Sequence, residues 1–248
     1  MTVKKLGNGA KTCLCVHGLG SNSSVFSDCI PEVLFAEWTF YCIDLPGHGN
    51  GPHFDASKYS IPKLLDWLQN SLPLPDFDAF MGHSLGGLLC MLMQNDCNIF
   101  KQGVILDLFP SARHPRGLRL LAKHFHEHFE AQLKHFYGFS HSKHPHVLNR
   151  ILKDARQCDP KVFYEVLNSL GDLAEKALEP IILSIPLTVI HQPNLSIDMD
   201  DKINRTFLLS PRVKFKQVKE TGHFVMLTQI EEFQTLLTES LGSIGFLL

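Results

Sequence analysis

Short runs of apolar residues alternate along most of the chain with longer segments in which apolar residues recur every three or four positions. Short runs are typical of buried strands, whereas the longer spacing places apolar side chains on one face of a helix. The predicted strands are Thr12–Val16, Thr39–Ile43, Phe77–Met81, Val104–Leu106, Leu187–Ile190 and Val213–Gln217. The predicted helices are Val25–Phe35, Ile61–Ser71, Leu85–Gln94, Asp198–Leu209 and Gln229–Leu241. This alternation predicts an α/β fold with a doubly wound, mostly parallel sheet.

The alternation stops between Ser111 and Pro180, where the pattern indicates helices only. One apolar stripe of this segment consists of Leu121, Phe125, Phe129, Leu133 and Phe136. We therefore predict a core formed by residues 1–110 and 181–248, with residues 111–180 inserted as a helical cap, or lid. Such a cap would cover the carboxyl ends of the strands, where α/β proteins bind ligands.

Composition and charge narrow the class of protein. With 248 residues, 44% of them hydrophobic, the chain can bury one large core but hardly two. Lysine and arginine number 23 against 25 aspartate and glutamate, so no excess of charge points to a nucleic acid or an anionic membrane as partner. The seven cysteines lack the paired spacing of disulfides or zinc sites, and no apolar run has the length of an export signal or a membrane span. We expect a cytoplasmic protein.

A G-x-S-x-G motif, Gly82–Gly86, lies between a predicted strand and a predicted helix. A serine in such a sharp turn, called a nucleophile elbow, needs small neighbours because the strained backbone brings flanking residues close together. The helix that follows directs its N-terminal N–H groups and the positive end of its dipole toward the serine, where negative charge develops in acyl transfer. These features predict Ser84 as a nucleophile.

Two further motifs complete a possible acyl-transfer site. The segment His17–Gly20 follows the first predicted strand, and its glycines would let the N–H groups of Leu19 and Leu85 form an oxyanion hole. His223 follows the last predicted strand, from which a histidine can reach the serine hydroxyl as a general base. We expect structural roles for His17, which would bind loop backbone, and for His83, which would help to build the serine turn. The motif Asp44–Gly49 indicates only a tight loop.

Taken in order, the motifs H-G-L-G, D-L-P-G-H-G, G-H-S-L-G-G and a late G-H-F resemble the α/β-hydrolase superfamily. The resemblance covers Thr12–Pro110 and Ile181–Leu241 and is specific for the fold and for the serine-histidine pair. It is less specific for the substrate, because the superfamily includes carboxylesterases, acyl thioesterases, pimeloyl-acyl-carrier-protein methyl ester esterases and the lyase of menaquinone synthesis. The resemblance implies a Ser-His-Asp triad that needs no metal or organic cofactor.

The triad acid is the point at which this chain departs from the family pattern. Most members carry it in a G-x-x-D turn after the penultimate strand, where this sequence has Gln192–Leu195. Asp198 or Asp200 could serve only if that loop is rearranged, although both also fit a helix start, with Asp198 as the N-cap. Asp107, at the end of Val104–Leu106, resembles the acid of haloalkane dehalogenases and of a group of small bacterial esterases. We favour Asp107, while Asp198 and a loop-capping role for Asp107 stay open.

The charge of the predicted cap bears on the substrate. Between Ser111 and Arg156, nine lysines and arginines, among them Arg113, Arg116 and Arg119, face only three acidic residues. A basic cap would attract an anionic acyl carrier, either acyl-CoA or acyl carrier protein, although a basic solvated face is an equally good interpretation. His124 and His128 have the spacing of metal ligands, but no neighbouring motif supports a metal, and we favour a solvated face.

The leading hypothesis from the sequence is a serine hydrolase that cleaves a carboxylic ester or an acyl thioester. Two alternatives stay open. One is a lyase of the menaquinone-pathway type that uses the same serine and histidine for proton abstraction. The other is a ligand receptor without enzymatic activity that retains the triad.

Overall fold

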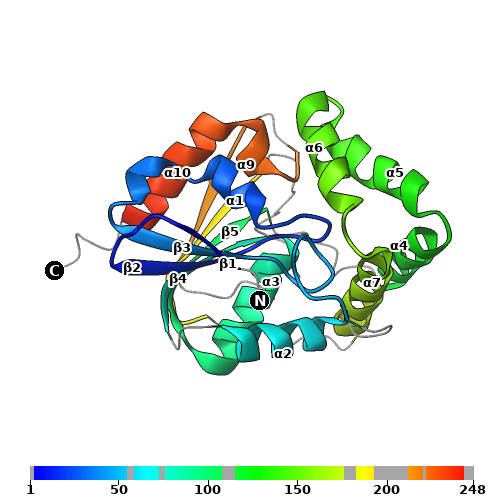
Figure 1. Ribbon diagram of the computed structural model, residues 1–248, viewed down its shortest axis with the longest axis horizontal. Helices are drawn as coiled ribbons and strands as arrows, with labels where there is room; N and C mark the ends of the chain where they lie inside the picture. The colour runs from blue at the N-terminus through cyan, green and yellow to red at the C-terminus, as the bar shows by residue number, and fades with distance from the viewer. Residues whose placement is uncertain are drawn as a thin grey trace.

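The protein contains a seven-stranded sheet in the strand order β1-β3-β2-β4-β5-β6-β7 (Figure 1). The computed structural model describes residues 3–54, 59–72, 76–107, 115–175, 183–192, 212–219 and 222–242. The strands are β1 (Val3–Leu6), β2 (Lys11–Val16), β3 (Trp38–Ile43), β4 (Phe77–His83), β5 (Phe100–Leu106), β6 (Leu187–His191) and β7 (Val213–Gln217). β1 pairs antiparallel with β3, whereas all other neighbours are parallel. The predicted α/β class and doubly wound sheet are therefore confirmed.

Helices cover both faces of the sheet, as Figure 1 shows. One face carries α1 (Ser24–Cys29), α9 (Val225–Thr228) and α10 (Ile230–Gly242), and the other carries α2 (Ile61–Ser71) and α3 (Leu85–Cys97). Alternate residues of β2 explain this arrangement, because successive side chains of a strand point to opposite faces. Cys13 and Cys15 pack into the cluster that contains Phe26 of α1, whereas Leu14 and Val16 pack into the other cluster.

Two details differ from the predicted elements, and one predicted helix is not tested. The predicted helix Val25–Phe35 ends at Cys29, because Ile30 is extended before Pro31, and a short 3-10 turn follows at Glu32–Leu34. β1 was not predicted, because its two exposed lysines hide the strand pattern at the sheet edge. The predicted helix Asp198–Leu209 lies outside the described residues.

Between β5 and β6, the described part of the chain contains four helices, which form the green group at the right of Figure 1. They are α4 (Pro115–Glu127), α5 (Phe129–His141), α6 (Pro145–Ala155) and α7 (Pro160–Glu175). Phe125 of the predicted stripe stacks on Phe163 of α7 at 4.8 Å between ring centroids. The N–H of Asp159 donates to the carbonyl of Gly47, in the loop after β3, at 2.9 Å. The group therefore contacts the carboxyl-end side of the sheet, while the predicted cap boundaries lie outside the described residues.

None of the helices that the structure describes combines the length and the apolar character needed to cross a membrane.

Candidate active site

Ser84 lies in a strained turn between β4 and α3. Its φ of 49° and ψ of −112° are unusual for any residue with a side chain. The turn is possible because its neighbours are glycines: a Cβ on Gly86 would lie 2.0 Å from the carbonyl oxygen of Val16. A Cβ on Gly82 would lie 2.5 Å from the Cα of Gly87. The sequence motif and the local geometry thus agree in placing Ser84 at the start of α3.

His223 and Asp107, which are 116 residues apart in the sequence, form a hydrogen-bonded pair. The Nδ1 of His223 lies 2.7 Å from Oδ2 of Asp107, whose side chain is fully buried. Asp107 directly follows β5, and its N–H donates to the carbonyl of Ile190 at 2.8 Å. A carboxylate at Nδ1 favours the tautomer with its proton on Nδ1, in which Nε2 of His223 carries the lone pair that a general base needs.

Gln192 also contacts the carboxylate of Asp107 and was not predicted from the sequence as a site residue. Its backbone N–H donates to Oδ1 at 3.1 Å, and its side-chain amide donates to Oδ2 at 2.8 Å. Gln192 directly follows β6, where the usual G-x-x-D turn would begin. These bonds and the bond from His223 fix the orientation of the Asp107 side chain.

The loop after β2 lies against the serine turn. A Cβ on Gly18 would lie 2.6 Å from Nδ1 of the buried His83 and 3.2 Å from the Cβ of Ser84, so this close approach favours glycine. The carbonyl of Leu19 accepts from the hydroxyl of Tyr137 in α5 at 2.9 Å, and the N–H of Gly20 donates to Nε2 of His48 at 3.1 Å. Both sides of Leu19 are therefore anchored, which fits a loop that presents its N–H toward a reacting oxygen.

His17 binds the backbone of two loops, in agreement with the structural role predicted for it. Its Nε2 accepts from the N–H of Leu45 at 3.0 Å, and its Nδ1 lies 2.8 Å from the carbonyl of Gly18. Burial lowers the pKa of His17, and burial together with the nearby His17 ring lowers the pKa of His48 to about 3. Both rings are therefore neutral and join the loop after β2 to the loop after β3.

The loop Asp44–Gly49 is more than the tight turn that its sequence indicates. The Asp44 carboxylate accepts from the backbone N–H of Ser23 at 2.6 Å and from that of Asn50 at 2.9 Å. A Cβ on Gly49 would lie 2.8 Å from this carboxylate. Asp44 thus ties the segment that leads into α1 to the loop after β3.

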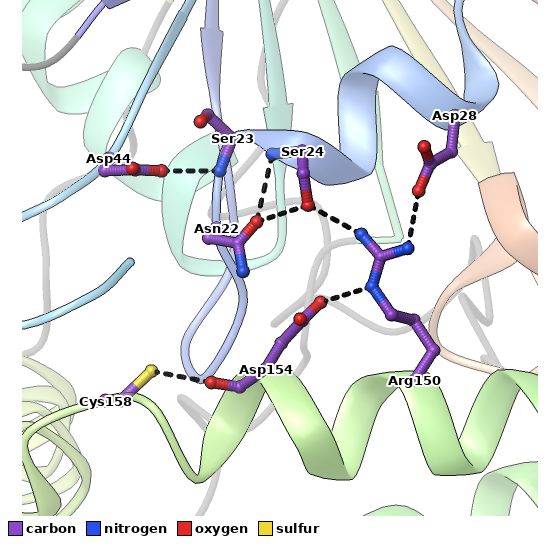
Figure 2. A network of polar contacts seen from close by, with 8 residues as sticks. All are labelled: Asn22, Ser23, Ser24, Asp28, Asp44, Arg150, Asp154 and Cys158. Atoms are coloured by element: carbon purple, nitrogen blue, oxygen red, sulfur yellow. Dashed lines mark hydrogen bonds and ion pairs between the residues drawn. The ribbon is translucent and has the colours of Figure 1, made fainter. Parts of the chain in front are cut away.

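A polar network joins α6 to α1 and to the loop before it, as Figure 2 shows. The guanidinium of Arg150 binds Asp154 of its own helix at 2.8 Å, Asp28 at 2.7 Å and the hydroxyl of Ser24 at 2.6 Å. Ser24 in turn donates to Asn22 at 2.5 Å. The residues of the network are Asn22, Ser23, Ser24, Asp28, Asp44, Arg150, Asp154 and Cys158. Arg150 thus connects α6 with α1.

The remaining predicted residues have different surroundings. Asp198 and Arg113 lie outside the described residues, and Arg116 is exposed on α4. Arg119 forms ion pairs with Asp172, at 2.8 Å, and with Glu175, both on α7. The charge of Arg119 is therefore balanced inside the helical group, which weakens its candidacy as a binder of anionic substrates. Within the described ranges, no three potential metal-binding side chains lie together, His124 and His128 included.

A serine in a strained strand-to-helix turn, with a histidine-carboxylate pair at the carboxyl ends of a parallel sheet, is the arrangement that defines α/β hydrolases. The chain belongs to this family: the sequence model described as "Alpha/beta hydrolase family" matches residues 13–234.

Named relatives and a solved structure extend the comparison. The chain is 37% identical over 89 residues to a pimeloyl-[acyl-carrier protein] methyl ester esterase of Aeromonas salmonicida, an alignment that covers 36% of this chain and 34% of the relative. It is 26% identical over 193 residues, 70% of each chain, to the esterase of the same name from Neisseria meningitidis serogroup C. The first alignment thus spans about a third of its relative. A hydrolase from Oleispira antarctica shares the fold with a TM-score of 0.79 at 15% identity, covering 97% of this chain and 94% of that one.

Proposed function

We propose that the protein is a serine hydrolase of carboxylic esters or acyl thioesters, with Ser84 as nucleophile, His223 as general base and Asp107 as triad acid. The observation that carries this proposal is the 2.7 Å pair of His223 and Asp107 beside the strained turn of Ser84. The serine turn and the loop that carries His223 are in direct contact. Nε2 of His83, the residue before Ser84, lies 3.0 Å from the carbonyl of His223.

The reaction follows from the roles of these groups. Nε2 of His223 takes the hydroxyl proton of Ser84 while Oγ attacks the substrate carbonyl, and the N–H groups of Leu19 and Leu85 stabilise the oxyanion. Asp107 stabilises the imidazolium formed in this step. The imidazolium then protonates the departing alcohol or thiol, which leaves Ser84 acylated. A water molecule, deprotonated by His223, attacks the acyl-enzyme and releases the carboxylic acid.

The substrate class that we propose is an acyl group on an anionic carrier, either coenzyme A or an acyl carrier protein. The relatives named as esterases of an acyl-carrier-protein methyl ester support an ester whose acyl group is carried by an acyl carrier protein. The excess of basic residues between Ser111 and Arg156 supports the same class. Arg113 and Arg116 are the stronger candidates for carrier contacts, because Arg119 is paired with α7.

We further propose a cytoplasmic location. All seven cysteines are free thiols, and six of them are buried. Unpaired thiols are typical of proteins in a reducing compartment.

The direct test is labelling with a fluorophosphonate, which phosphonylates only an activated serine, followed by mass mapping. We expect a single modification, at Ser84, and we expect Ser84→Ala to lose both labelling and hydrolysis while keeping the circular dichroism spectrum and melting temperature of the parent. Labelling that persists in Ser84→Ala would contradict the proposal.

A substrate panel separates the alternatives. Short p-nitrophenyl esters and acyl-CoA thioesters, assayed at low and high salt, should both show an acyl-enzyme burst, and only the anionic substrates should bind more weakly as salt is added. A lyase would show neither burst nor ester turnover. A receptor would react once and then be stabilised by its ligand.

A further inference from the structure

One peptide group beside the proposed base is held by two histidines from different elements. The carbonyl of His223 accepts from Nε2 of His83 at 3.0 Å. The N–H of Phe224, which belongs to the same peptide group, donates to Nε2 of His141 at 3.2 Å. His141 lies at the end of α5, 82 positions before His223 in the chain. The backbone next to His223 is thus fixed from the serine side and from the helical group at once.

The bonds assign a tautomer to each ring, and the bond from Phe224 also requires His141 to be neutral. Nε2 of His141 accepts a hydrogen bond, so the ring carries its hydrogen on Nδ1, which lies 3.1 Å from the carbonyl of Tyr137. His83 donates through Nε2, and its Nδ1 has no hydrogen-bond partner within the described chain. Both side chains are buried, and burial is the main cause that lowers both pKa values, that of His141 to about 4.

Helix α5 also reaches the opposite side of the site. Tyr137, one helical turn before His141, donates its hydroxyl to the carbonyl of Leu19 at 2.9 Å. The ring of Phe224 lies between these groups, with ring centroids 5.6 Å from His141, 6.1 Å from Tyr137 and 4.6 Å from His83. A single helix therefore contacts both the loop proposed for the oxyanion hole and the loop that carries the base.

We infer that His141 is a positioning residue for His223: it holds the peptide group after the base, and through it the direction of the imidazole. The inference rests on the proposed function. If the acceptor at His141 is lost, the buried N–H of Phe224 must find another partner, and the peptide group will rotate. Because His223 is attached to that group, its ring will move relative to Ser84.

The test compares substitutions at His141 that differ in acceptor position. His141→Leu removes the acceptor. His141→Gln places an amide oxygen near the position of Nε2, whereas the side chain in His141→Asn is too short for its amide oxygen to reach the N–H of Phe224. We expect His141→Leu and His141→Asn to lower kcat and the rate constant of fluorophosphonate labelling by about 10- to 100-fold, the effect of a misplacement of about 1 Å. We expect KM for p-nitrophenyl butyrate to stay within about threefold, because substrate contacts are unchanged. His141→Gln should recover most of the rate.

Leu133→Ala is the matched control, because Leu133 is a fully buried residue of the same helix. We expect it to lower the melting temperature while leaving kcat and the labelling rate at the parental level. Proton NMR adds an independent readout: the downfield Nδ1–H signal of the His223–Asp107 bond should shift or broaden in His141→Leu but not in Leu133→Ala.

The inference is overturned if His141→Leu behaves like Leu133→Ala, or if Gln is as slow as Asn. Should His141→Leu fail to fold, the comparison of Gln with Asn decides the question. Failure of the proposed function looks different, since Ser84→Ala and His223→Ala would then keep ester turnover and labelling whatever residue is at position 141.

Discussion

Three non-glycine residues of the described chain have a positive φ: Ser84 at 49°, Asn98 at 51° and Asp107 at 45°. Asn98 has an ordinary explanation, because it ends α3 as a left-handed cap. The other two are the proposed nucleophile and the proposed triad acid. Backbone strain persists where the surrounding structure enforces it, and such places are often functional. The strain therefore supports the site independently of its motifs.

Asparagine at position 107 tests the acid. Asp107→Asn preserves size but favours the wrong tautomer of His223, so we expect kcat to fall by about 10⁴-fold with little change in melting temperature. Asp198→Asn is the comparison, and we expect it to cost about 1 kcal/mol or less of stability and little rate, as for a helix cap. If Asp198→Asn abolishes turnover while Asp107→Asn keeps it, the loop after β6 supplies the acid and our assignment is wrong.

The residues of the candidate site that the sequence could reveal are those with motifs. Ser84 is recognisable because glycines surround it, and His223 because it follows the last predicted strand. Gln192 and His141 carry no such local pattern. Their roles depend on contacts with residues 85 and 83 positions away, and only the folded chain brings those residues together.

The same holds for helices and strands: those with a clear local sequence pattern could be predicted, and those that depend on distant parts of the chain could not. The buried parallel strands were predictable because their apolar runs are continuous, whereas the edge strand β1 shows two exposed lysines between partly buried ends. The predicted helix Val25–Phe35 has the correct periodicity, yet Pro31 restricts Ile30 to an extended conformation and divides the segment. How the helices α4–α7 attach to the sheet could not be predicted, because the attachment includes contacts between residues far apart in the sequence, such as the ion pair of Arg150 with Asp28.

Arg150 provides the test of that attachment. Its guanidinium is about one-third exposed and binds Asp154, Asp28 and Ser24 with its three nitrogens (Figure 2). We expect Arg150→Met to lower the free energy of unfolding by about 1–3 kcal/mol, because Asp154 would stay largely buried without its charged partner. Arg150→Lys should recover less than half of this loss, since an ammonium cannot reproduce the planar fork.

Lys153→Met is the control for Arg150, because Lys153 is exposed on the same helix. Urea unfolding of the three variants measures the free energies. Equal losses for Arg150→Met and Lys153→Met would mean that the network in Figure 2 contributes no more than ordinary surface charge.

At the scale of the whole molecule, the site is built around buried neutral histidines. Burial is the main cause that lowers the pKa values of these histidines. They join the loops after β2 and β3, the end of β4, the loop that carries His223, and α5. The residues are His17, His48, His83 and His141. His17, His48 and His141 each accept a hydrogen bond at a ring nitrogen, which requires the neutral ring. The same residues that organise the site therefore make the folded state sensitive to acid.

The sign of this effect follows from linkage. Above about pH 6.5, neither the folded nor the unfolded state protonates these rings, and the full stability is present. As the pH falls below that value, the unfolded chain takes up protons that the folded chain excludes, so stability is lost. The loss continues until the folded pKa is reached, which is about 4 for His141 and about 3 for His48. Each histidine contributes up to about 1.4 kcal/mol per pH unit within its window.

His48→Gln isolates one of these contributions. The glutamine amide can still accept from the N–H of Gly20, but it does not titrate, so the pH dependence should weaken even if the variant is less stable at neutral pH. We expect the free energy of unfolding in urea, measured between pH 6.5 and 4.5, to fall less steeply by about 1 kcal/mol per pH unit than in the parent. His135→Gln, a substitution on the exposed face of α5, should keep the parental slope. A parental slope in His48→Gln as well would mean that His48 is not buried as a neutral ring, and that acid destabilises the protein through other groups.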